Sequence, residues 1–305
     1  MDSRSSPDSQ TRIRLTGGSD PRLTLAPLWH GPGDPVMRFD GRVIVRALRT
    51  PAGAATIRLA LGRADVEVQA WGPGATAAID TLPELLGERD DPAALQPRDR
   101  LLRDLHRRLA GLRLTRTGAV MEALLPAIIA QKVTNLEARR SYRDLVRRLG
   151  EPAPGPLGLM LPPAPQNLAR LPYHDFHRSG IERRRAEAIT AAARAASRLE
   201  EVSRWPADAA RRRLLAVRGV GRWTAAETLR VVLGDADAVS VGDYNLPKLV
   251  SWALAGEPRG DEARMLELLE PYRGQRARVV LLLELSGLRP PRYGPRLPPR
   301  SITAM

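Results

Sequence analysis

The pattern of apolar and polar positions changes character along the chain. Residues 1–31 are rich in Ser, Asp, Pro and Gly without periodicity, which predicts a largely disordered tail with a short edge segment at 23–25. Residues 32–95 alternate between apolar and polar, as half-buried strands do. Residues 96–290 follow a helical spacing, and the Pro- and Arg-rich residues 291–305 are expected to form a second loose tail.

This pattern predicts an α+β fold, with a small N-terminal antiparallel sheet domain and a mainly α-helical body. Turn residues separate the predicted strands, and a helical stretch from about Ala75 to Leu86 follows them. Gly- and Pro-rich breaks separate the later helices. The predicted strands are Arg42–Leu48, Thr56–Leu61 and Val66–Trp71, and the predicted helices are Leu101–Ala110, Met121–Gln131, Leu136–Leu149, Gln166–Leu171, Arg183–Leu199, Ala207–Val217, Trp223–Leu233, Leu246–Leu254, Arg259–Leu269 and Gln275–Ser286.

Two of these helices are joined by a very short turn. The run that ends at Val217 is followed by Arg218-Gly-Val-Gly221, and the next helix begins at once, which predicts a helix-hairpin-helix. Gly219 and Gly221 have no Cβ, so the turn can adopt unusual φ angles and approach a partner's backbone. The first amides of the second helix lack intrahelical acceptors and suit a phosphate. A plain helix corner with a Gly stop is the alternative for this motif taken alone.

The composition favours a polyanionic partner. The formal net charge is +14, and nearly all the positive charge is Arg, since Lys132 and Lys248 are the only lysines. Such an excess indicates nucleic acid before membrane, although a genome biased towards Arg codons would explain part of it. Only 4% of residues are aromatic, which argues against broad single-strand stacking and for duplex DNA.

Other features of the composition exclude several classes of site. The chain has no Cys, which rules out disulfides, thiolate zinc sites and Cys-ligated iron–sulfur clusters. No apolar run reaches about 18 residues, and the N-terminus lacks a signal-like apolar region. We therefore expect a soluble, cytoplasmic, nucleoid-associated protein, a monomer with no membrane partner.

An acidic residue follows the hairpin at a short distance. Asp243 lies after Gly242 and before another predicted helix, so its plain reading is a helix N-cap. A capping Asp is held ionised by amides and the helix dipole, and beside a nucleic-acid backbone it repels phosphate. Stabilising a cation is one role that would balance this cost. A sugar that loses its base becomes cation-like, and opposite charges roughly 4 Å apart attract by about 4 kcal/mol, or about three decades in rate.

The hairpin and this Asp together resemble a known family. The segment L-x-x-x-x-G-V-G-R-W-T-A, with Asp243 22 residues after Gly221, is similar to the helix-hairpin-helix DNA glycosylase superfamily. It looks closest to the 3-methyladenine DNA glycosylase II branch, which excises alkylated bases. Residues 127–133 resemble that branch's apolar helix, which ends in a Gln-containing loop that enters the DNA. The order of sheet domain and helical body also fits, over roughly residues 36–290.

The resemblance implies a role for each matching residue. Trp223 occupies the position where lyase-capable relatives carry a nucleophilic Lys, so no Schiff base forms there and water attacks the sugar. Lys132 and Lys248 are the remaining candidate amines, and phosphate or solvent contact is favoured for both. No cofactor is required. The implied assignments are Asp243 as the catalytic aspartate, Gly219, Gly221, Arg222, Thr224, Gln131 and Lys132 for DNA binding, Trp223 and Tyr244 for the base pocket, and the carbonyls of Leu215, Val217 and Val220 for a structural monovalent cation.

Two positions depart from the pattern of the branch. Lys132 stands where an apolar wedge is usual, and the helix at 275–286 lacks the expected aromatic pocket residues.

The resemblance as a whole implies a monofunctional glycosylase that acts in base excision repair. It would remove 3-methyladenine- or 7-methylguanine-type bases from duplex DNA, by flipping the damaged base out of the helix. The alternatives are the same chemistry on oxidised or deaminated bases, and a DNA-binding module without catalysis.

Overall fold

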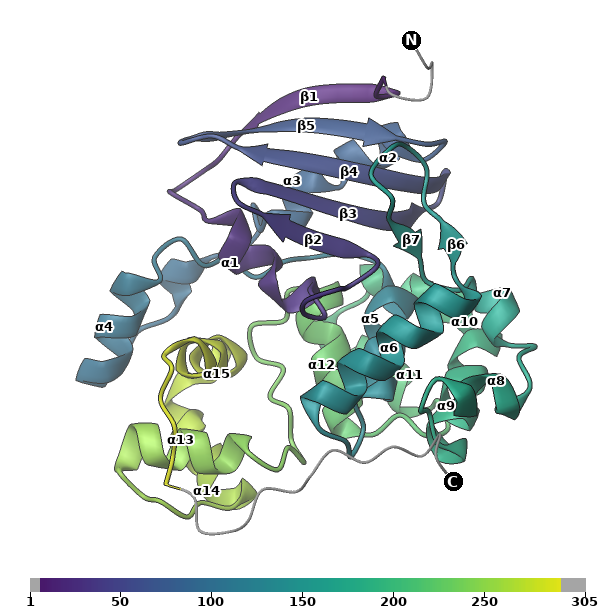
Figure 1. Cartoon of the computed structure of the whole chain (residues 1–305). Coiled ribbons are helices and arrows are strands. Elements are labelled where there is room, and N and C mark those ends of the chain that lie inside the picture. The colour runs from purple at the N-terminus through teal and green to yellow at the C-terminus, as the bar shows by residue number, and fades with distance from the viewer. Residues whose placement is uncertain (1–5, 292–305) are drawn as a thin grey trace.

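The computed structural model describes residues 6–291 and begins with a five-stranded antiparallel sheet (Figure 1). The strand order is β1-β5-β4-β3-β2, and the pairing of β3 with β4 runs from Val43↔Ala60 to Thr50↔Gly53. One sheet face packs against α2 and α3 through apolar residues. The strands are β1 (Ser9–Arg14), β2 (Met37–Asp40), β3 (Val43–Thr50), β4 (Gly53–Leu61) and β5 (Asp65–Trp71), followed by α2 (Ala75–Asp80) and α3 (Leu82–Leu85).

The predicted disorder of residues 1–31 is wrong for most of that segment. Residues 9–14 form β1, which pairs with β5 and places Ile13 opposite Val66. The segment 23–25 belongs to a helix, α1 (Pro21–Leu25), rather than to an edge strand. Asp20 caps this helix by accepting the amide of Arg22 at 2.8 Å, and Leu25 is buried. The pairing of β1 with β5 is a long-range contact, and the Asp20 cap is a local one. Neither changes the spacing of apolar residues along the sequence, from which the elements were predicted.

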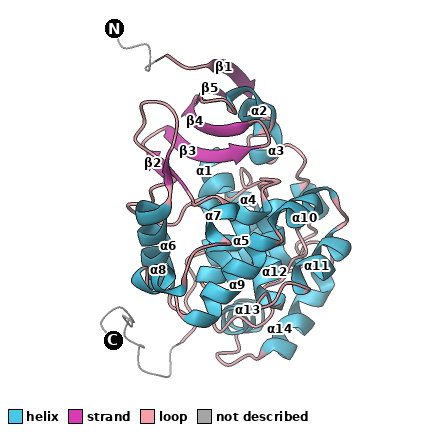
Figure 2. Ribbon diagram, turned by 90° about the vertical axis from the view of Figure 1, so that its right-hand side faces the viewer, coloured by secondary structure: helices cyan, strands magenta, loops and turns pink. Residues whose placement is uncertain are grey.

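The helical body is built around α5, which contacts α12, α9, α6 and α10 (Figure 2). A single apolar core joins these helices. The long helix predicted at 183–199 is divided at Ala195 into two helices. The elements of this body are α5 (Val120–Ile129), α6 (Asn135–Leu149), β6 (Glu151–Pro152), β7 (Met160–Leu161), α7 (Pro165–Leu168), α8 (Tyr173–Arg178), α9 (Arg183–Arg194), α10 (Ala196–Glu200), α11 (Ala207–Leu215) and α12 (Arg222–Val232).

A smaller helical unit has its own core and stands beside this body (Figure 1). It combines α4, from before the body, with three helices from after it, and an extended linker at 233–245 leads into it. Its helices are α4 (Arg100–Arg108), α13 (Leu246–Ala255), α14 (Glu262–Leu269) and α15 (Arg276–Leu285). The predicted tail at 291–305 lies outside the described residues beyond Pro291. Among residues 6–291, no helix is long and apolar enough to cross a membrane.

A buried ion pair joins the smaller unit to the segment after the sheet domain. Arg278 on α15 donates to Asp90, and only 2% and 6% of these two side chains are exposed. The second oxygen of Asp90 accepts the amide of Leu114 at 3.0 Å. Removing one member of such a pair leaves a buried charge without compensation.

We predict that Asp90→Ala lowers the free energy of unfolding by about 3 kcal/mol or more, because Arg278 would remain buried without its carboxylate. The control is Asp104→Ala, which removes the partner of Arg107, an ion pair whose side chains are 78% and 44% exposed. That change should cost less than about 1 kcal/mol. Urea unfolding measures both, and equal losses would contradict this view of the Asp90–Arg278 pair.

Candidate active site

The predicted hairpin is present, and its two glycines have different structural roles. Gly219 has φ +86°, and a Cβ there would lie 2.5 Å from the Cβ of Ala188 on α9. Position 219 therefore requires glycine for two reasons: the backbone is left-handed, and α9 lies too close for a side chain. Gly221 is extended, with φ −98° and ψ −178°, and a Cβ there would meet nothing within 4 Å. Gly221 thus leaves open space in front of the first amides of α12.

Gln131 fastens the end of α5 to this hairpin. Its side-chain nitrogen donates to the carbonyl of Gly219 at 2.9 Å and to Oγ1 of Thr224 at 2.8 Å. Thr224 is buried, so its hydroxyl faces Gln131 and not solvent. Lys132 follows with φ +55°, the one non-glycine residue with a positive φ among the described residues, and its side chain is exposed. Contact of Gln131 and Lys132 with DNA stays a prediction.

The remaining hairpin predictions differ in exposure, since Arg222 and Leu215 are exposed whereas Val220 is buried. The side chain of Arg222 is 73% exposed and lies 3.5 Å from Glu262. The carbonyl of Val217 accepts the amide of Val220 at 3.0 Å, which leaves one of its lone pairs for another ligand. The monovalent cation proposed for the carbonyls of Leu215, Val217 and Val220 stays a prediction. Within residues 6–291, no group of three or more His, Cys, Asp or Glu side chains could hold a metal ion.

Asp243 is held on both carboxylate oxygens. Oδ1 accepts the amides of Asn245 at 2.7 Å and Leu246 at 2.9 Å, where α13 begins. Oδ2 accepts Nε1 of Trp223 at 3.2 Å, so the indole on α12 orients the carboxylate beside the hairpin. The side chain is half-buried, and Oδ2 keeps a further lone pair. The sequence placed these two residues in one site but did not foresee the hydrogen bond between them.

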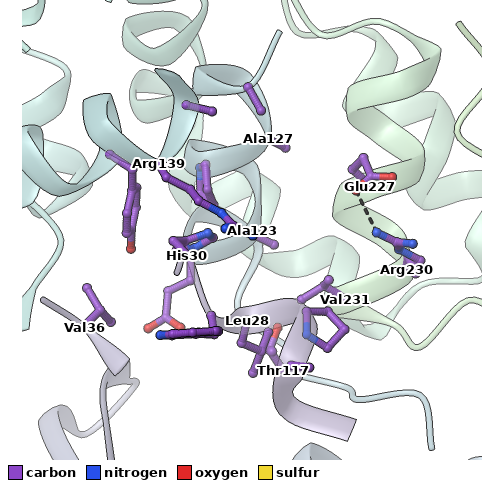
Figure 3. A pocket seen from close by; sticks show the side chains of 18 of the residues that line it. Leu28, His30, Val36, Thr117, Ala123, Ala127, Arg139, Glu227, Arg230 and Val231 are labelled. Atoms are coloured by element: carbon purple, nitrogen blue, oxygen red, sulfur yellow. Dashed lines mark hydrogen bonds and ion pairs between the residues drawn. The ribbon is translucent and has the colours of Figure 1, made fainter. Parts of the chain in front are cut away.

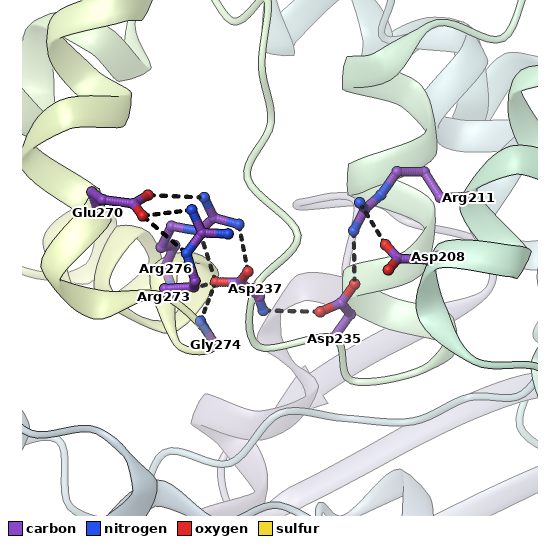
Figure 4. Close-up of polar contacts among 8 residues, drawn as sticks. All are labelled: Asp208, Arg211, Asp235, Asp237, Glu270, Arg273, Gly274 and Arg276. Atoms are coloured by element: carbon purple, nitrogen blue, oxygen red, sulfur yellow. Dashed lines mark hydrogen bonds and ion pairs between the residues drawn. The ribbon is translucent and has the colours of Figure 1, made fainter.

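Two acidic residues anchor the linker that carries Asp243 (Figure 4). Asp237 accepts the amides of Gly274 at 2.8 Å and Arg276 at 3.1 Å, and it also pairs with the Arg276 guanidinium. Partial burial opposes ionisation, but the hydrogen bonds from Arg276 and Gly274 hold the pKa of Asp237 below its usual value. Asp235 lies 3.6 Å from Arg211 on α11. The first part of the linker therefore lies between α11 of the hairpin and the start of α15, and contacts both.

A pocket of about 330 Å³ opens beside Trp223 (Figure 3). Its walls come from the segment 26–30, α5, α6 and α12, and Trp29 and Trp223 both line it. The aromatic residues that the sequence lacks on α15 are thus supplied by the N-terminal segment and the hairpin. Asp243 is not among the residues that line the pocket, but it accepts a hydrogen bond from Trp223, which does line it.

Several polar side chains line the pocket, and most are paired. Arg46 donates to Glu122 at 2.6 Å, and Arg230 donates to Glu227 at 2.8 Å. Sequence reasoning missed the contribution of the N-terminal segment because its Pro- and Gly-rich composition predicts disorder. The contribution of α6 could have been found from helical spacing, because residues 135, 138, 139 and 142 share one face of this helix and all line the pocket.

Tyr244, which the sequence assigned to the base pocket, lies outside the pocket described above. Its side chain is 79% exposed and is not among the residues that line the pocket. The Nζ of Lys248, one turn further on, lies 3.6 Å from the centre of the Tyr244 ring. This cation–π contact holds the ring at the surface.

We predict opposite outcomes for the two hairpin glycines. Gly219→Ala should lower the free energy of unfolding by about 1–3 kcal/mol, because it forces a side chain into a positive φ and against Ala188. Gly221→Ala should change it by less than about 0.5 kcal/mol. Denaturant unfolding of the two variants measures this, and a Gly221→Ala variant as unstable as Gly219→Ala would contradict the assignment.

Three solved structures share this architecture. A 3-methyladenine DNA glycosylase from Archaeoglobus fulgidus is 23% identical, with a TM-score of 0.78 over 90% of this chain and 97% of that chain. An 8-oxoguanine glycosylase/lyase from Clostridium acetobutylicum is 14% identical, with a TM-score of 0.71 over 91% and 96%. A 3-methyladenine DNA glycosylase from Schizosaccharomyces pombe, in complex with abasic DNA, is 18% identical, with a TM-score of 0.54 over 66% and 98%.

No family model and no curated protein sequence matches the chain. At these identities the likeness establishes the fold, and it confirms the predicted order of an N-terminal sheet domain and a helical body. The chain therefore has the fold of the helix-hairpin-helix DNA glycosylases.

Proposed function

We propose that this protein is a monofunctional DNA N-glycosylase, which hydrolyses the bond between a damaged base and its sugar in duplex DNA. The observation that carries this proposal is the position of Asp243. Its carboxylate is fixed by the indole of Trp223, and that indole also lines a pocket of a size suited to one base. A flipped base in the pocket would place its sugar beside the carboxylate.

The reaction needs stabilisation of positive charge on the sugar. As the N-glycosidic bond breaks, the sugar becomes oxocarbenium-like, and the bonding electrons leave with the base. A carboxylate roughly 4 Å away stabilises this charge by about 4 kcal/mol at an effective dielectric of about 20. The free lone pair of Oδ2 could also orient the attacking water and accept its proton. Because three donors already fix the carboxylate, little reorganisation is needed during the reaction.

In this proposal the hairpin binds a phosphate of the DNA strand. The open space in front of Gly221 and the unpaired first amides of α12 suit a phosphate oxygen. The net charge of +14 supports the same polyanionic partner. A monovalent cation on the carbonyls of Leu215, Val217 and Val220 would add positive charge to this turn.

The residue after Arg222 supports hydrolysis without strand cleavage. Trp223 has no amine, so it cannot form a Schiff base with the sugar. The chain's two lysines lie elsewhere, Lys132 on an exposed turn and Lys248 against the ring of Tyr244. Water is therefore the nucleophile in the proposed reaction.

Alkylated purines are the first substrates to test, because their positive charge already weakens the N-glycosidic bond. The faces of Trp29 and Trp223 suit an electron-poor base. Oxidised or deaminated bases are the second candidate. The observation that favours them is the number of polar side chains in the pocket.

We predict that Asp243→Asn slows base release by about three decades while leaving duplex binding intact, because the variant loses the charge but keeps the shape. The control is Asp261→Asn, which alters another aspartate that caps a helix, accepting the amide of Arg264 at 2.8 Å. Single-turnover release of bases from methylated duplex DNA measures both. Equal release by wild type and Asp243→Asn would contradict the catalytic role of Asp243, whereas release by neither protein would leave only a DNA-binding module.

We also predict that the wild-type protein leaves intact abasic strands, because no lysine lies at the hairpin position. Gel analysis without added base, together with borohydride trapping, tests this. A trapped adduct that disappears in Lys132→Ala or Lys248→Ala would contradict the monofunctional assignment and identify the amine.

A further inference from the structure

A group of neighbouring polar side chains in the pocket wall makes no hydrogen bond or ion pair with any other residue in 6–291. The group consists of His30, Arg139 and Tyr142. The other charged residues of the pocket are paired, as Arg46 is with Glu122. The unpaired groups lie together, since the rings of His30 and Tyr142 are 4.3 Å apart between centroids, and Arg139 extends towards His30 (Figure 3).

The contacts of α6 explain why Arg139 is available. Arg143 and Arg147 follow on the same helix face and donate to the carbonyls of Pro32 at 3.4 Å and Gly33 at 3.2 Å. These two arginines hold the N-terminal segment. The stem of Arg139 packs on Gly31, where a Cβ would lie 3.0 Å from Cδ of Arg139. Arg139 is exposed, and its guanidinium has no protein acceptor among the described residues, so it is open both to solvent and to an occupant of the pocket.

The two ring residues present donors as well. Burial lowers the pKa of His30, and Arg139 and Arg46 lower it further against the opposing effect of Asp34, so the imidazole is neutral near pH 7. Burial and Asp34 raise the pKa of Tyr142, which keeps its hydroxyl proton. Only 4% of Tyr142 is exposed, and its hydroxyl has no partner among the described residues. Since Tyr142 lines the pocket, its hydroxyl is a donor that an occupant of the pocket could accept from.

We propose that the pocket selects a purine with a carbonyl oxygen at C6, which accepts hydrogen bonds from Arg139 and from the neighbouring ring residues. This inference rests on the proposed glycosylase function. A guanidinium pairs well with the O6 edge of a purine. A 6-amino base such as 3-methyladenine would present an N–H group to these donors instead of an acceptor. Hypoxanthine is the simplest neutral base of the selected class.

The test compares two lesions and two neighbouring arginines. Single-turnover release is measured for hypoxanthine in a duplex and for 3-methyladenine in methylated DNA, with the wild type, Arg139→Gln and Arg140→Gln. Arg140 is exposed, lies 3.8 Å from Asp144 and does not line the pocket. Arg139→Gln should reduce the ratio of hypoxanthine to 3-methyladenine release by about tenfold or more, whereas Arg140→Gln should leave the ratio unchanged.

Other results would overturn the proposal. An equal loss on both lesions would make Arg139 a phosphate contact, and an unchanged ratio would remove it from base recognition. Wild-type release of 3-methyladenine without any release of hypoxanthine would overturn the selectivity and leave the glycosylase function standing. Release of neither base, with hypoxanthine and alkylated bases all retained, would overturn both.

Discussion

The proposed site depends on the hydrogen bond between the indole of Trp223 and the carboxylate of Asp243. This bond, of 3.2 Å, joins α12 to the linker that precedes α13, and the amides of Asn245 and Leu246 complete the hold on the carboxylate. Three donors fix the direction of this carboxylate. The anchored linker and the glycine turn matter chiefly because they bring these two residues together.

The sheet domain has a clear structural role in this arrangement. It leads the chain from β1 through α1 to the segment 26–36, which lies against α6 and supplies Trp29 and His30 to the pocket. The arginines of α6 hold this segment by its carbonyl groups, so part of the positive charge of the chain is structural. Net charge alone therefore overstates how much of the surface is available for DNA.

The sequence predicted the parts of the molecule that local rules determine. Strict alternation located β3, β4 and β5, and the spacing of glycines, Trp223 and Asp243 located the hairpin and the carboxylate. The sequence could not predict the pocket wall formed by Trp29 and His30, because that segment is ordered by contacts with a helix more than 100 residues away. Tyr244 differs, because its contact with Lys248 is local, and the sequence did not reveal that its ring lies at the surface.

The central claim is that Asp243 faces a sugar that becomes positively charged. The most direct measurement compares the affinity for two duplexes, one with a cationic pyrrolidine ring in place of the sugar and one with an uncharged tetrahydrofuran ring. The account predicts that the wild type prefers the cationic duplex by about 100-fold or more, and that Asp243→Asn loses most of this preference. An equal preference in both proteins would contradict it.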